Sequence, residues 1–74
     1  MTTSERMERA EQVRQAVEAE QIPTLSASVW TKGETVRVYL RDNRGDKGYL
    51  GIGPAGAVED QTRGYSSLSR RVAR

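Results

Sequence analysis

The sequence predicts an α+β fold, in which an N-terminal helix packs on an antiparallel sheet of three or four strands. Three observations support this fold class. Apolar residues recur at helical intervals in residues 4–21, alternate with polar residues in 25–42, and continue that alternation in a shorter stretch at 48–53. A chain of 74 residues has room for one hydrophobic core, so residues 1–74 are expected to form a single small domain.

The helix is expected to span residues 4–21. Thr2 and Glu5 have the spacing of a capping box, in which each side chain accepts a hydrogen bond from the other residue's backbone N–H. Pro23 ends the helix, because a residue that precedes proline is disfavoured in the helical region. The apolar face of this helix would be formed by Met7, Ala10, Val13, Ala16 and Val17.

Residues 25–31 and 35–42 are expected to form a β-hairpin around a two-residue turn at Lys32–Gly33. This register would place Val29 opposite Val36 and gather aliphatic side chains on one side of the hairpin. A shift of one residue would mix apolar and polar side chains, so burial specifies which side faces the core. The other side would carry Ser26, Ser28, Trp30, Thr35, Arg37, Tyr39 and Arg41.

A third strand is expected at residues 48–53, after a turn-rich loop. Pairing Leu40 with Leu50 keeps the aliphatic side chains of the two strands on one face. The same register would place Arg41 beside Tyr49 on the opposite face. The agreement between the two strand pairs predicts an antiparallel meander.

The sequence leaves two later elements open. Residues 57–62 could form a fourth strand at the sheet edge, although three consecutive polar residues weaken that pattern. Residues 66–74 could form a short C-terminal helix, because two apolar residues recur there at helical spacing, or could fray as chain ends often do.

The residue types available exclude several kinds of chemistry. The chain contains no cysteine and no histidine, so disulfides, the usual zinc sites and thiol or imidazole catalysis are unavailable. A core this small is not expected to hold a substrate pocket. We therefore expect a protein that is not an enzyme and that uses no metal or cofactor. The carboxylates of the sheet half are expected to be ordinary, water-exposed groups: Asp42, Asp46, Glu59 and Asp60.

Charge is distributed unevenly along the chain. Residues 1–23 carry three basic and five acidic groups, a balance of −2, whereas residues 24–74 carry nine basic and five acidic groups, a balance of +4. Within the acidic helix, the spacing predicts two ion pairs, Glu5–Arg9 and Glu11–Arg14. The sequence shows no apolar stretch of membrane-spanning length and no signal-peptide core, so we expect a cytoplasmic protein without a membrane partner.

The polar face of the sheet is the best candidate for a binding surface. Aromatic rings interleaved with arginines can stack on bases and pair with phosphates, and the positive balance of the sheet half favours nucleic acid as the partner. Two other interpretations stay open. The rings could simply cover the sheet, or they could form an interface with another protein. The residues of this candidate surface are Trp30, Arg37, Tyr39, Arg41, Arg44, Lys47 and Tyr49.

The alternative function is a protein-interaction or inhibitor module, of the kind encoded by phages and mobile elements as small accessory proteins. Self-association is also expected, because the core is small, lacks disulfides, and leaves a strand edge near the third and fourth strands that could pair. No motif in the sequence identifies a family.

Overall fold

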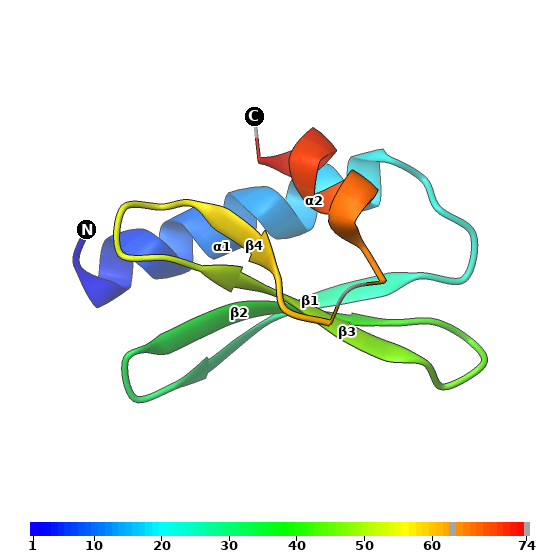
Figure 1. Cartoon of the computed structure of the whole chain (residues 1–74), viewed down its shortest axis with the longest axis horizontal. Helices are drawn as coiled ribbons and strands as arrows, with labels where there is room; N and C mark the ends of the chain where they lie inside the picture. Colours follow the sequence, from blue (N-terminus) through cyan, green and yellow to red (C-terminus); the bar gives the residue numbers. More distant parts are fainter. Residues whose placement is uncertain (63, 74) are drawn as a thin grey trace.

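The computed structural model describes residues 1–62 and 64–73, and it confirms the predicted α+β fold class (Figure 1). Four strands form one antiparallel sheet in the order β1-β2-β3-β4. Both helices lie on the same face of this sheet (Figure 1). The elements are α1 (Thr3–Ala19), β1 (Ser26–Lys32), β2 (Thr35–Arg41), β3 (Lys47–Ile52), β4 (Val58–Asp60) and α2 (Ser66–Val72).

Helix α1 begins as predicted, with a complete capping box. The Oγ1 of Thr2 accepts a hydrogen bond from the backbone N–H of Glu5 at 3.1 Å, and Glu5 Oε1 accepts one from the N–H of Thr2 at 2.9 Å. The helix ends at Ala19, two residues earlier than predicted. Gln21 adopts φ +52°, in the left-handed region, so the helical conformation does not reach it.

Two arginines of α1 bind backbone carbonyls of distant segments. Arg9 does not pair with Glu5 as predicted: it donates to the carbonyl of Gly56 at 3.1 Å and to that of Ala73 at 2.7 Å. Arg6 donates to the carbonyls of Ile52 and Glu34. These carbonyls lie at strand ends and in turns, where no ladder partner is available. The two arginines therefore fix the helix to the rest of the fold.

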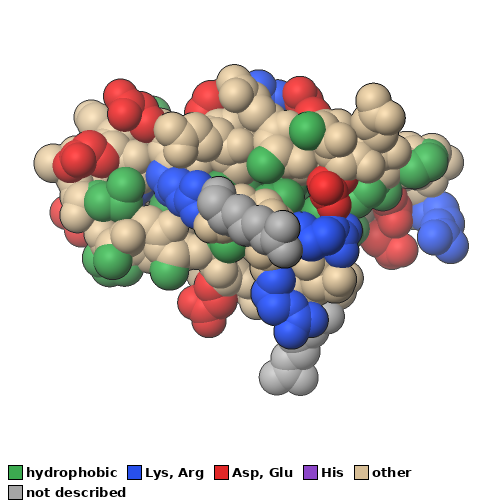
Figure 2. Space-filling view, turned by 90° about the horizontal axis from the view of Figure 1, so that it is seen from above, with side chains coloured by type: hydrophobic (Ala, Val, Ile, Leu, Met, Phe, Trp, Pro, Cys, Tyr) green, Lys and Arg blue, Asp and Glu red, His purple; other side chains and the backbone are tan. Residues whose placement is uncertain are grey.

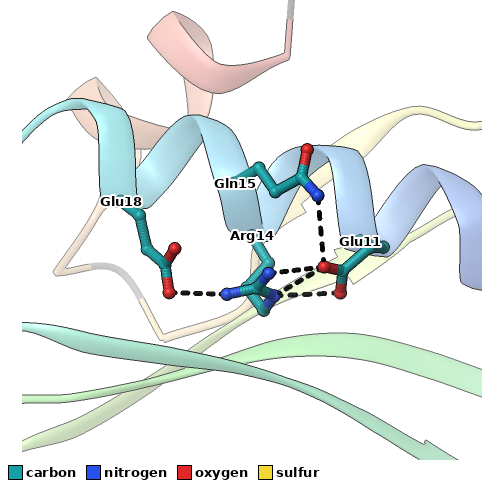
Figure 3. Close-up of polar contacts among 4 residues, drawn as sticks. All are labelled: Glu11, Arg14, Gln15 and Glu18. Atoms are coloured by element: carbon teal, nitrogen blue, oxygen red, sulfur yellow. Dashed lines mark hydrogen bonds and ion pairs between the residues drawn. The ribbon is translucent and has the colours of Figure 1, made fainter.

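The second predicted ion pair is confirmed and forms part of a larger group. Arg14 lies between Glu11 and Glu18, with N–O distances of 2.5 Å to each (Figure 3). The hydrogen bond from Arg14 lowers the pKa of Glu11. Gln15 also donates to Glu11, at 3.4 Å. This arginine is thus fully engaged within α1.

The hairpin register differs from the prediction by two residues. Val29 faces Val38 rather than Val36, and the two-residue loop is Gly33–Glu34, which follows the last pair, Lys32 with Thr35. Gly33 has φ +58°, a left-handed value that a glycine adopts without steric cost, so the loop places glycine first. A shift of two residues preserves the faces, which is why the predicted division into apolar and polar sides still holds.

The β2–β3 register is also two residues from the prediction. Val38, not Leu40, faces Leu50, and Arg41 pairs with Lys47. The loop between the strands is closed by Asp42, whose Oδ1 accepts hydrogen bonds from the N–H groups of Arg44 and Asp46, both at 2.9 Å. A backbone bond from Asp42 N–H to the Asp46 carbonyl, at 3.1 Å, completes it. These hydrogen bonds within the loop determine which residues of β2 and β3 pair.

The two elements that the sequence left open are both present. Strand β4 covers only part of residues 57–62, and α2 begins at the predicted position. The last position of the predicted segment, 74, lies outside the described residues. The core is aliphatic and uses side chains from both helices and the sheet, namely Ala10, Val13, Val17, Val36, Val38, Leu40, Leu50, Ile52, Leu68 and Val72.

Asp60 organises the connection from β4 to α2, contrary to the expectation that it is an ordinary carboxylate. It accepts hydrogen bonds from Thr62 N–H at 2.9 Å, Thr62 Oγ1 at 3.0 Å and Tyr65 N–H at 2.8 Å, and a longer one from Ser66 Oγ at 3.4 Å. Burial alone would raise the pKa of Asp60, but these hydrogen bonds outweigh it and lower the pKa. The carboxylate thus positions α2 against the sheet.

Candidate functional site

The candidate site is the sheet surface that the helices leave uncovered, which we call the outer face. Cross-strand pairs place Trp30 opposite Arg37, Tyr39 opposite Tyr49, and Arg41 opposite Lys47, so their side chains share one face. The same pairing defines the whole outer face as Ser26, Ser28, Trp30, Lys32, Thr35, Arg37, Tyr39, Arg41, Lys47, Tyr49, Gly51 and Glu59.

Arg37 stands at the centre of the outer face and contacts two aromatic rings. Its Cζ lies 5.2 Å from the centroid of the Trp30 ring and 4.5 Å from that of the Tyr49 ring, within the range of cation–π interactions. The two rings come from β1 and β3, on either side of Arg37 on β2. Its Nε is buried without a hydrogen-bond partner among the described residues. The arginine and the two rings therefore form one packed group.

The three aromatic rings of the outer face differ in how far they are exposed to solvent. Trp30 is 38% exposed and is among the few large apolar side chains on the surface, whereas Tyr39 and Tyr49 are half-buried. Trp30 is therefore the principal aromatic contact point of the outer face. Tyr39 and Tyr49 form a cross-strand aromatic pair that extends the platform.

Three of the four cations of the outer face have no hydrogen-bond or ion-pair partner among the described residues. Lys32, Arg41 and Lys47 are exposed, and within residues 1–62 and 64–73 none of their side chains makes a hydrogen bond or an ion pair. Together with Arg37 they give four cations against one carboxylate, Glu59. The opposite side differs: Figure 2, seen from above the helices, shows acidic and basic side chains interspersed.

The prediction of the site missed one residue and misplaced another. Lys32 was assigned to the hairpin turn, yet it is the last residue of β1 and belongs to the outer face. The preference of such turns for glycine at the first position was the signal that could have found it. Arg44 does not join the surface: it lines a cleft with Ile22, Pro23 and Leu68, next to α2.

Two open clefts lie on the described part of the surface, and the expectation that the small core holds no substrate pocket stays a prediction. The cleft beside Arg44 has a volume of about 420 Å³, at the lower end of ligand-site volumes. Its other arginine, Arg71, is already bound to Glu20 and Ser67. This pairing leaves the cleft without a clear preference for ligands of either charge.

The second cleft adjoins the outer face and has a volume of about 350 Å³. Arg37 lines it together with Gly51 and Gln61. The Gln61 side chain lies over Gly51 so closely that a Cβ there would stand 2.4 Å from its Nε2. Two carboxylates, Glu34 and Glu59, also line this cleft. This cleft therefore forms a polar edge of the outer face and is lined by both positively and negatively charged side chains.

The part of the chain that the structure describes holds neither a metal-binding cluster nor a membrane-spanning helix. No three His, Cys, Asp or Glu residues among the described positions come together as ligands for a metal ion. Neither α1 nor α2, the helices within the described ranges, has the length and apolar character needed to cross a bilayer.

No family model, curated protein or solved structure matches this chain.

Proposed function

We propose that this protein is a non-enzymatic binding module that docks nucleic acid on its outer face. The observation that carries the proposal is the packed group of Arg37, Trp30 and Tyr49, surrounded by three cations that have no hydrogen-bond or ion-pair partner in residues 1–62 and 64–73. Lysine and arginine side chains on such a surface can neutralise phosphates, and aromatic rings can contact bases. The cleft beside Arg44 lacks a comparable concentration of one charge.

The alternative is a protein-interaction or inhibitor module that uses the same face. One observation favours it: the Arg37 Nε is buried, and its guanidinium is held against two rings, so this arginine is less available to phosphates than a free side chain. Tryptophan, tyrosine and arginine are also the residues that most often dominate protein interfaces.

Salt dependence separates the two functions. We expect labelled DNA or RNA to bind at low salt and to weaken steeply as salt rises, by about 0.9 log units per log unit of salt for each duplex phosphate neutralised. Arg41→Gln is expected to reduce that slope by about 1, because it removes one phosphate contact. Fluorescence anisotropy titrations at several salt concentrations measure both quantities.

Arg70→Gln is the matched control, because Arg70 is also an exposed arginine but lies on α2, away from the outer face. It should leave affinity and slope nearly unchanged. If no nucleic acid binds at low salt, or if both variants have equal effects, the proposed function is wrong. A protein partner bound through Trp30 with little salt dependence would support the alternative.

A further inference from the structure

We propose that the outer face binds a single strand of nucleic acid that runs along β1 and β2, with unpaired bases on the aromatic rings and phosphates on the cations at both ends. This inference rests on the proposed function and narrows its ligand to single-stranded DNA or RNA. Three observations carry it: the order of charges and rings along the sheet, the length of that arrangement, and the position of the most exposed ring.

Apart from Arg37, which lies opposite Trp30, the cations and the rings occupy different rows of the outer face. Lys32 pairs with Thr35 in the row beside the hairpin loop. Arg41 and Lys47 pair in the row at the other end of β2. The rows between them hold the aromatic residues, Trp30, Tyr39 and Tyr49. A ligand that spans this surface therefore meets positive charge, then rings, then positive charge.

The length of the arrangement fits a short segment of nucleic acid. Thr35 and Arg41 mark the two cationic rows on β2 and are six residues apart, which corresponds to roughly 20 Å of strand. A stacked single strand advances about 3.4 Å per nucleotide, so this length accommodates up to about six nucleotides. Fewer nucleotides would span it if the bases are splayed onto separate rings.

The rings favour a single strand over a duplex. In a duplex the faces of the bases are covered by their neighbours, so a flat sheet surface would present its rings to sugars and phosphates. A single strand can instead place a base on Trp30 while its phosphates reach the cations on either side. Arg37 acts as a positioning residue, because its contacts hold the rings of Trp30 and Tyr49 in place.

The chain contains one tryptophan, so fluorescence excited selectively at the indole reports on this surface. We expect oligothymidylate and oligouridylate of six and twelve nucleotides to quench Trp30 emission, and a twelve-base-pair duplex to change it little. Affinity per protein should stop rising beyond about six nucleotides. The salt slope should be about 2, because three cations without internal partners each neutralise one single-strand phosphate at about 0.7.

Variants read by anisotropy of a labelled oligonucleotide complete the test. Trp30→Thr should weaken single-strand binding about five- to 100-fold, the range expected for loss of one base–ring contact. Trp30→Phe keeps a ring and should retain most of the affinity, which separates stacking from a folding defect. Circular dichroism of each variant checks the fold.

The outcomes distinguish this inference from the proposed function. If the duplex binds as tightly as the single strand, and Arg41→Gln weakens binding while Trp30→Thr does not, then the single-strand inference is wrong and the nucleic-acid function stands. If neither form binds at low salt, both are wrong. Quenching by only one of the two oligonucleotides supports the inference and shows that the surface discriminates between them by the 2′-hydroxyl of the sugar or the methyl group of thymine.

Discussion

At the scale of single residues, the arginines of this protein have two different roles. Arg6 and Arg9 are bound to carbonyls of other segments and hold α1 in place, and Arg14 is bound to carboxylates within α1. Arg37 and Arg41 instead lie on the outer face, one packed against rings and the other without an internal partner. The charge available to a ligand therefore depends on where the arginines lie in the fold, and not on how many there are.

Asp60 gives a prediction at this scale. Asp60→Asn removes an acceptor that the N–H of Tyr65 uses, and we expect it to lower the free energy of unfolding at pH 7 by about 1–2 kcal/mol. Glu59→Gln is the control, because Glu59 is the exposed neighbour of Asp60 on β4. Urea unfolding of the three proteins measures the effect. Equal stabilities would show that the carboxylate does not organise this connection.

The pH dependence of that effect follows from the lowered pKa of Asp60. A carboxyl group whose pKa is lower in the folded state stabilises the fold fully above its usual pKa of 3.8. This contribution is lost as the pH falls through the folded-state pKa, which lies below that value. The difference between wild type and Asp60→Asn should therefore be largest at neutral pH and should shrink in acid.

At the scale of elements, the alternation of side chains predicts the faces of the sheet but not its register. The division into an aliphatic and a polar side is correct, because a period of two assigns each residue to a face regardless of shifts by two. The register depends instead on the loops. Gly33 occupies the first position of its turn, where φ is positive, and Asp42 closes the next loop through its own hydrogen bonds.

The alternation of side chains along the strands also predicts most of the candidate site. Trp30, Arg37, Tyr39, Arg41, Lys47 and Tyr49 lie on one face as expected. Lys32 was missed because the turn was placed one residue too early. Arg44 was misplaced because a loop residue has no alternation to guide it, and in the structure it lines the cleft beside α2 and the α1–β1 connection.

The strand edges lead to a prediction of self-association. The sheet ends at β1 and β4, so the predicted edge near the third and fourth strands is formed by β4, while β3 pairs on both sides. Strand β1 is the longer edge, with seven residues against three in β4. Because an unpaired edge can add a strand from a second copy, we expect the mass measured by light scattering to rise over a hundredfold concentration range. A constant monomer mass would contradict this expectation.

At the scale of the whole molecule, the fold has two layers and one uncovered surface. Both helices lie on one side of the sheet (Figure 1), where they cover its aliphatic side chains. The register places the aromatic residues Trp30, Tyr39 and Tyr49 on the other side. A sheet covered on one face only is common in antiparallel folds, where the second face is usually polar. Here that face carries rings and an excess of positive charge, which is the basis of the proposed function.

The most direct test of this account is a map of the binding surface by NMR. We expect titration of the ¹⁵N-labelled protein with a six-nucleotide oligothymidylate to shift the Trp30 indole N–H, the Arg37 side-chain Nε–H and backbone amides of β1, β2 and β3. The exposed face of α1 should stay unchanged and serves as the internal reference. Shifts confined to the helices or to the cleft beside Arg44, with the Trp30 and Arg37 signals unmoved, would contradict the assignment of the outer face as the binding surface.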